Sequence, residues 1–70
     1  MSWDKDQMNY GVVKIEGSNK VKVFKSQTNY TLIAVSEDIT DARWGGDAVV
    51  VYLKNGKVRR YTSTTSYTIV

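Results

Sequence analysis

Residues 47–63 read DAVVVYLKNGKVRRYTS, and this segment decides the fold of the chain. Two β-prone runs flank Asn55-Gly56, the dipeptide most typical of a two-residue type I′ hairpin turn, because both residues tolerate positive φ. We therefore predict a β-hairpin that turns at Asn55-Gly56. Counting outward from the turn pairs Lys54 with Lys57, Leu53 with Val58, Tyr52 with Arg59, Val51 with Arg60, and Val50 with Tyr61.

This register gives the hairpin two different faces, because successive side chains of a strand alternate. The first face forms most of a core wall and carries Val49, Val51, Leu53, Val58, Arg60 and Thr62. The second face carries Val50 and an aromatic strip with a cationic end. We name this strip the predicted Tyr–Arg strip; it consists of Tyr52, Tyr61, Arg59, Lys54 and Lys57.

The chain has 70 residues, which is enough for one domain with a thin core. A chain of this size buries only about 60% of the surface that its unfolded form exposes. Cys and His are both absent, so neither disulfides nor the usual zinc ligands stabilise it. Stability then comes from packed β-branched residues or from a face buried against another subunit, and we expect a homo-oligomer.

The ends and the apolar runs indicate where the protein works. No run approaches the roughly 18 apolar residues of a membrane helix, and the N-terminus has no signal-peptide layout. We expect no membrane association and a cytoplasmic location. Phages and mobile elements encode short, basic, cofactor-free β-proteins as virion parts or inhibitors; for such a protein the location is the host cytoplasm.

The charge is unevenly distributed along the chain. The formal net charge is +3, but residues 36–47 carry a local charge of −3 and residues 48–70 a local charge of +4. This pattern predicts a dipolar surface that steers a charged partner.

We divide the chain into an N-terminal arm, residues 1–9, and a single small β domain, residues 10–70. The arm is polar apart from Trp3 and Met8, and we expect Trp3 to dock on this subunit or on a neighbouring one.

Residues 10–26 predict a second hairpin with the loop Gly17-Ser18-Asn19. A three-residue loop pairs Glu16 with Lys20, Ile15 with Val21, Lys14 with Lys22, Val13 with Val23, and Val12 with Phe24. This register gathers the apolar residues on one face, whereas a two-residue loop mixes the faces. Asn19 then adopts a left-handed backbone conformation. The lysines that point outward form a solvated face; they are Lys14, Lys20, Lys22 and Lys25.

The remaining segments complete the prediction. Residues 30–36 read as a third strand, apolar on both faces and hence near the middle of the sheet. Residues 36–46 read as the non-strand segment, with one short helical turn or a loop near 37–44 that begins at Ser36 and ends at Gly45-Gly46. Residues 64–70 read as a short last strand that pairs with the first hairpin and closes a barrel.

The predicted fold is therefore all-β: a small antiparallel barrel or strongly bent sheet of five to six strands. The succession of short strands, with one non-strand segment before the Asn-Gly hairpin, resembles a small SH3-like barrel in its layout. Such a resemblance of layout carries no diagnostic residue and implies nothing specific about function.

Catalytic chemistry is sparse in this sequence. No motif marks an activated Ser or Thr, and the carboxylates of Glu37, Asp38 and Asp41 lack the spacing of a calcium loop. Gly45-Gly46 is not part of a phosphate-binding loop. We expect no enzymatic activity, no metal site and no cofactor.

Residues 42–47, ARWGGD, form the most unusual stretch. Two interpretations of Trp44 stay open: a stacking platform beside Arg43 on a loop, or the largest core residue at one end of the barrel. The core interpretation is favoured because a domain this small needs the buried area.

We expect a non-catalytic protein-interaction module that self-associates or binds an unidentified protein. The candidate contact residues are the predicted Tyr–Arg strip together with Arg43, Trp44 and Trp3. The alternative is a nucleic-acid-binding barrel, in which tyrosines stack on bases while Arg and Lys neutralise phosphates.

Overall fold

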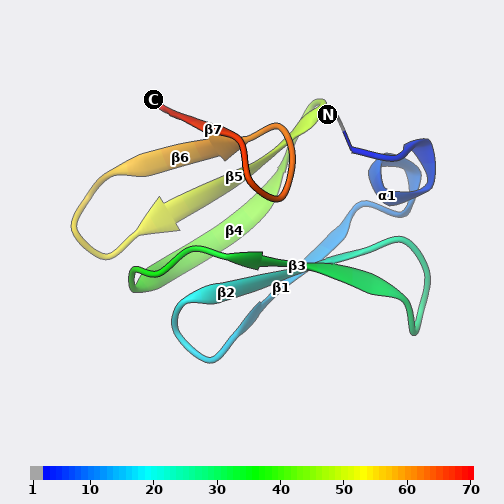
Figure 1. Ribbon diagram of the computed structural model, residues 1–70, viewed down its shortest axis with the longest axis horizontal. Helices are drawn as coiled ribbons and strands as arrows, with labels where there is room; N and C mark the ends of the chain where they lie inside the picture. Colours follow the sequence, from blue (N-terminus) through cyan, green and yellow to red (C-terminus); the bar gives the residue numbers. More distant parts are fainter. Residues whose placement is uncertain (1–2) are drawn as a thin grey trace.

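The computed structural model describes residues 3–70, and seven antiparallel strands in two sheets form most of it (Figure 1). The first sheet has the order β1-β2-β3 and the second the order β4-β5-β6-β7. The elements are α1 (Lys5–Tyr10), β1 (Val12–Glu16), β2 (Lys20–Phe24), β3 (Tyr30–Ala34), β4 (Ile39–Gly45), β5 (Ala48–Leu53), β6 (Val58–Tyr61) and β7 (Tyr67–Ile69). The all-β prediction is confirmed, with seven strands in place of five to six. No helix within residues 3–70 has the length and hydrophobicity to span a bilayer.

The β1–β2 hairpin has the predicted register, from Glu16 opposite Lys20 to Val12 opposite Phe24. Val21 and Val23 are fully buried, as expected of the inward face, whereas Ile15 remains 37% exposed. The left-handed residue of the loop is Gly17, at φ 63°, and not Asn19. Glycine adopts this conformation with less strain than asparagine does.

The third predicted strand exists as β3, but it lies at the edge of its sheet and not in the middle. Its only neighbour in the sheet is β2, with Lys22 opposite Leu32. Ile33 is fully buried, whereas Tyr30 and Leu32 are 46% and 39% exposed. The two apolar faces of this strand therefore do not indicate a central position.

The prediction of a helical turn or loop near 37–44 is wrong, because this segment is strand β4. A bulge between Ile39 and Asp41 shifts the register of β4 against β5. Ile39, Ala42 and Trp44 all pack against the core as a result. The bulge adds one residue to the spacing between Ile39 and Ala42, and this extra residue hides the alternation of a strand in the sequence.

The predicted register of the β5–β6 hairpin is wrong by one residue. Val49 faces Tyr61, Val51 faces Arg59, and the N–H of Leu53 donates to the carbonyl of Lys57 at 2.9 Å. The loop therefore has three residues, Lys54-Asn55-Gly56. Among its residues only Gly56 has a positive φ, 90°. The N–H of Gly56 donates to the carbonyl of Leu53 at 3.0 Å, as in a type I turn followed by a left-handed glycine.

The predicted closure of a barrel by the last strand is also wrong. β7 pairs with β6, with Tyr67 opposite Tyr61, and no closed barrel is present among residues 3–70. β1 packs against β4, so the two sheets meet along that side. On the other side, β3 and β7 are the outer strands of their sheets. The fold is a two-sheet structure with one side left open.

Residues 3–9 of the predicted arm dock on the domain, and its first two residues lie outside the described residues. Trp3 is only 5% exposed, and its Nε1 donates to the carbonyl of Tyr61 at 3.0 Å. Helix α1 follows, with the side chain of Gln7 accepting the N–H of Asp4 and donating to Thr31 Oγ1 on β3. The helix ends at Gly11, whose φ is 67°.

Candidate functional site

The register of β5 and β6 divides the predicted Tyr–Arg strip between two faces. Arg59 and Tyr61 lie on the inner face, opposite Val51 and Val49. Tyr52 lies on the outer face opposite Val58. Lys54 belongs to the loop and Lys57 follows it, and both are exposed. The structure therefore does not bring these five residues together as one surface.

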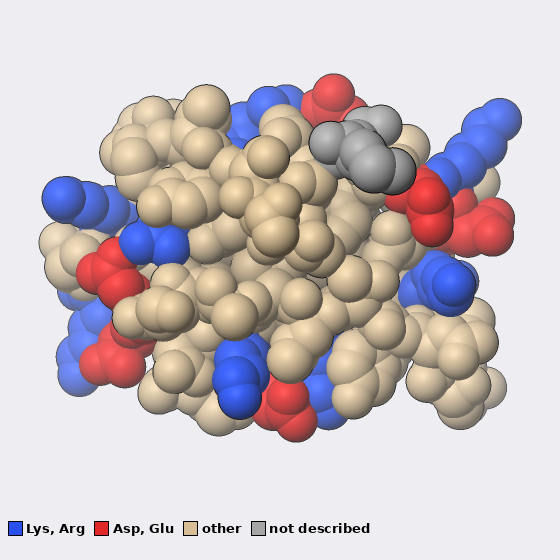
Figure 2. All heavy atoms as spheres, in the orientation of Figure 1, with Lys and Arg blue, Asp and Glu red and all other residues tan. Residues whose placement is uncertain are grey.

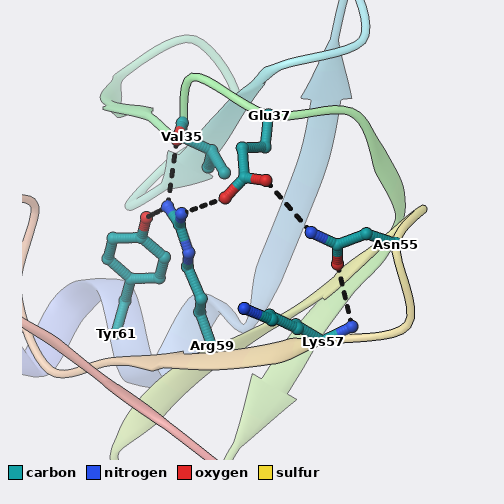
Figure 3. Close-up of polar contacts among 6 residues, drawn as sticks. All are labelled: Val35, Glu37, Asn55, Lys57, Arg59 and Tyr61. Carbon is teal, nitrogen blue, oxygen red and sulfur yellow. Dashed lines mark hydrogen bonds and ion pairs between the residues drawn. The ribbon is translucent and has the colours of Figure 1, made fainter.

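Arg59 joins the two sheets (Figure 3). Its Nη1 donates to the carbonyl of Val35 and to Tyr61 Oη, each at 3.0 Å, and its Nη2 pairs with the carboxylate of Glu37. The guanidinium lies 4.5 Å from the ring centroid of Tyr67. Only 12% of the side chain is exposed, so Arg59 is a largely buried residue that connects the two sheets and is not a free cation.

The network around Arg59 extends to the tip of the β5–β6 hairpin. Asn55 Nδ2 donates to the carboxylate of Glu37 at 3.1 Å, and Asn55 Oδ1 accepts the N–H of Lys57 at 2.9 Å (Figure 3). The hydrogen bond to Tyr61 raises the pKa of Arg59, and burial acts in the opposite direction. Arg59 therefore stays charged and holds the segment after β3 against β6.

A groove of about 580 Å³ opens above this network, between β3 and the β6–β7 turn. Leu32, Ala34 and Val35 line one wall, and Tyr61 and Tyr67 contribute to the other. The middle of the face in Figure 2, over β3 and the β6–β7 turn, is formed by uncharged side chains, and the charged ones lie around its rim. The groove therefore presents an apolar and hydroxyl-bearing surface.

The β3 edge beside this groove carries backbone groups that point away from its sheet. At the two ends of β3, the carbonyl of Asn29 accepts the N–H of Lys25 and the N–H of Val35 donates to the carbonyl of Asn19. Hydrogen-bonded pairs alternate along an antiparallel ladder. The N–H and C=O groups of residues 30, 32 and 34 consequently point toward the open side.

The same geometry holds for β7. The N–H of Thr62 donates to the carbonyl of Ser66, and the N–H of Val70 donates to the carbonyl of Val58. The backbone groups of Tyr67 and Ile69 therefore point away from β6. Two strand edges with outward-directed backbone groups thus flank one groove. Sequence reasoning missed this site because it depends on which strands lie at the edges.

Trp3 belongs to the buried core cluster, and Trp44 packs against that cluster without being its largest core residue. Their ring centroids are 5.9 Å apart and the rings meet edge to face, with an interplanar angle of 79°. Trp44 is half-buried and packs against the core cluster. The indole of Trp3 is therefore closed to a stacking ligand.

The remaining predicted contact residue, Arg43, lies on the outer face of the second sheet. Its Nη2 pairs with Asp41 at 2.6 Å, and its guanidinium lies 5.4 Å from the ring centroid of Tyr52. The hydrogen bond from Arg43 lowers the pKa of Asp41, and the N–H of Ala42 adds to this effect. Arg43 and Asp41 therefore neutralise each other on the surface.

The acidic and basic segments also do not form the predicted dipole. Each arginine of the described residues pairs with an acid of residues 36–47: Arg43 with Asp41, Arg59 with Glu37 and Arg60 with Asp47. The charges of the two segments therefore compensate each other locally, and the unpaired cations of this region are Lys54 and Lys57 at the hairpin tip.

Residues 3–70 contain no group of three or more His, Cys, Asp or Glu side chains that could hold a metal ion. Comparisons with protein-family models, with curated proteins and with solved structures found no match. The geometry of the groove and of the sheet faces is therefore the basis for a functional hypothesis.

Proposed function

We propose that this protein is a non-catalytic interaction module that self-associates through its open side. The observation that carries the proposal is the pair of strand edges, β3 and β7, on either side of a groove lined by apolar and hydroxyl-bearing side chains. Outward-directed backbone groups on a sheet edge pair readily with another strand. The exposed apolar side chains of Leu32, Tyr67 and Ile69 add area that association would bury.

A second copy of the chain fits this surface for an electrostatic reason. The chain carries a net charge of +3, so contact between two copies is unfavourable wherever their charges meet. The middle of the open face is uncharged, as Figure 2 shows, and two copies can meet there without bringing like charges together. A two-fold contact is the commonest closed arrangement.

Pairing β3 with β3 of a second copy gives such a contact. An antiparallel ladder centred on Leu32 places Tyr30 opposite Ala34 of the other copy and uses the outward-directed groups of all three residues. Two three-stranded sheets would then form one continuous sheet of six strands. At about 25 cal/mol per Å², burial of a few hundred Å² of apolar surface supplies several kcal/mol of gross stabilisation.

Light scattering after gel filtration tests this proposal at micromolar concentration. We expect a mass at least twice the 7.9 kDa of one chain. Leu32→Lys places a charge at the centre of the contact and should yield monomers, because lysine on an edge strand opposes edge-to-edge pairing. Thr28→Lys, in the exposed β2–β3 turn, adds the same charge away from the ladder and should leave the mass unchanged. A wild-type monomer at all concentrations contradicts the proposal.

A further inference from the structure

The outer face of the first sheet combines lysines with aromatic rings. Side chains of β1 and β2 that point away from the core include Lys14, Lys20, Lys22 and Phe24, and Tyr30 of β3 lies opposite Phe24. The only acid among the outward residues of these three strands is Glu16. The face therefore carries a net charge of +2 from its strand residues, and Lys25 directly follows β2.

The two rings are neighbours, and a lysine lies over each of them. The ring centroids of Phe24 and Tyr30 are 5.3 Å apart with an interplanar angle of 50°. Lys22 Nζ lies 4.8 Å from the centroid of Tyr30, and Lys14 Nζ lies 5.8 Å from that of Phe24. Each ammonium is thus held within a few Å of a partly exposed π-face.

The outer face of the second sheet has no such excess of charge. Its arginines are Arg43 and Arg60, which pair with Asp41 and Asp47. On the first sheet only Lys22 has an acid partner, Glu16 at 3.3 Å, whereas Lys14 and Lys20 pair with no acid of the described residues. Among the strand residues that the structure describes, uncompensated positive charge and aromatic rings therefore coincide on the outer face of the first sheet.

We propose that this outer face binds single-stranded nucleic acid. Phe24 and Tyr30 supply two adjacent stacking positions for unpaired bases, and Lys14, Lys20 and Lys22 supply the charge that neutralises the backbone on either side. A base that stacks on a ring displaces the ammonium above it toward a neighbouring phosphate. The side chains of this site do not line the groove between β3 and β7, although the backbone of Tyr30 belongs to the proposed β3–β3 ladder. The inference does not rest on self-association.

The chemistry of the face favours single strands over duplexes and over acidic proteins. Base–aromatic stacking needs unpaired bases, which a duplex keeps inside its own stack. An acidic protein surface would use the lysines but would leave the Phe24–Tyr30 pair without a matching flat partner. Lysines distributed among rings on an open sheet match the combination by which proteins bind single strands without sequence preference.

Fluorescence anisotropy with labelled oligo-dT and oligo-rU of about 12 nucleotides tests the inference on the full chain, since single-strand sites span about 4–16 nucleotides. We expect binding at low salt that weakens with a log–log slope of about −2, because three lysines each neutralise one phosphate at about −0.7 per contact. A duplex of the same length should bind several-fold more weakly.

Matched variants assign the binding to this face. The triple variant Lys14→Gln, Lys20→Gln, Lys22→Gln should abolish binding, whereas Lys54→Gln with Lys57→Gln, at the exposed hairpin tip, should keep most of it. Tyr30→Ala should weaken binding about tenfold with an unchanged salt slope. Tyr10→Ala serves as its control, because Tyr10 is 43% exposed and Tyr30 46%. Circular dichroism confirms that each variant is folded.

Four outcomes would overturn the inference. They are no binding to either oligonucleotide at low salt, unchanged binding by the triple variant, equal loss in the Tyr10 and Tyr30 variants, and equal affinity for the duplex. Binding to polyglutamate with no binding to oligonucleotides would assign the face to an acidic protein partner instead.

Discussion

The guanidinium of Arg59 on β6 donates a hydrogen bond to the carbonyl of Val35, 3.0 Å away, in the segment that follows β3 of the other sheet. This contact crosses between the sheets close to the groove. It links the end of β3 to β6, and both residues line the groove.

Arg59→Ala should lower the free energy of unfolding by about 2–4 kcal/mol, because it removes several charge-assisted hydrogen bonds from a largely buried site. Arg60→Ala is the matched control. Arg60 lies on the outer face with 38% of its side chain exposed, and its surface pair with Asp47 is worth about 0–1 kcal/mol. Urea unfolding measures the change in the free energy of unfolding for both variants. A larger effect of Arg60→Ala would contradict the register of β5 and β6.

Gly56→Val should lower stability by about 1–3 kcal/mol, because Gly56 has a φ of 90° that a β-branched residue rarely adopts. A Cβ at Gly56 meets no atom within 4 Å, so the cost is backbone strain and not a clash. Asn55→Gly should cost about 1–2 kcal/mol, since Asn55 loses the hydrogen bond that it accepts from Lys57 N–H and the one that it donates to Glu37. An unchanged thermal midpoint for Gly56→Val would place the turn elsewhere.

Trp3→Ala should lower the free energy of unfolding by about 3–5 kcal/mol, the usual cost of truncating a buried Trp. Trp3 packs with the core cluster and donates to the Tyr61 carbonyl. Tyr10→Ala, near the same end of the chain but exposed, should cost about 0.5 kcal/mol or less. Equal effects of the two variants would show that the arm is not docked.

The pKa of Asp41 should lie below its ordinary value of 3.8, because Arg43 and the N–H of Ala42 donate to its carboxylate. A carboxyl group whose pKa is lower in the folded state stabilises the fold above the unfolded pKa, and that stabilisation disappears as the pH falls through the folded pKa. An NMR titration of the Asp41 carboxyl carbon measures this directly. Arg43→Gln should raise the pKa toward 3.8; no change would show that the pair does not form in solution.

The sequence predicts the β1–β2 hairpin correctly because only one register gathers its apolar side chains on one face. The same criterion is ambiguous for β5 and β6, where Val50 and Tyr52 make the second face almost as apolar as the first. The Asn-Gly dipeptide then favoured a two-residue turn, but Asn55 does not have a positive φ in the structure. A three-residue loop places Tyr61, only 2% exposed, in the core.

Two other elements, β4 and α1, differ from the prediction for local reasons. The bulge beside Ile39 breaks the alternation of β4, so the segment lacks the period of a strand. Helix α1 does have a signal in the sequence: Asp4 and Gln7 lie at the spacing of a capping box, and Gly11 follows as the C-cap. The open groove had no sequence signal, because edge positions follow from the pairing of whole strands.

Amide hydrogen exchange, resolved by residue and measured at high and low micromolar protein concentration, tests self-association through β3 most directly. The N–H groups of Tyr30, Leu32 and Ala34 point to the open side and are exposed in a single copy, whereas pairing with a second copy protects them. We predict slow exchange of these three amides at high concentration and fast exchange on dilution, with Thr31 and Ile33 protected at both. Fast exchange of residues 30, 32 and 34 at every concentration would contradict the proposed contact.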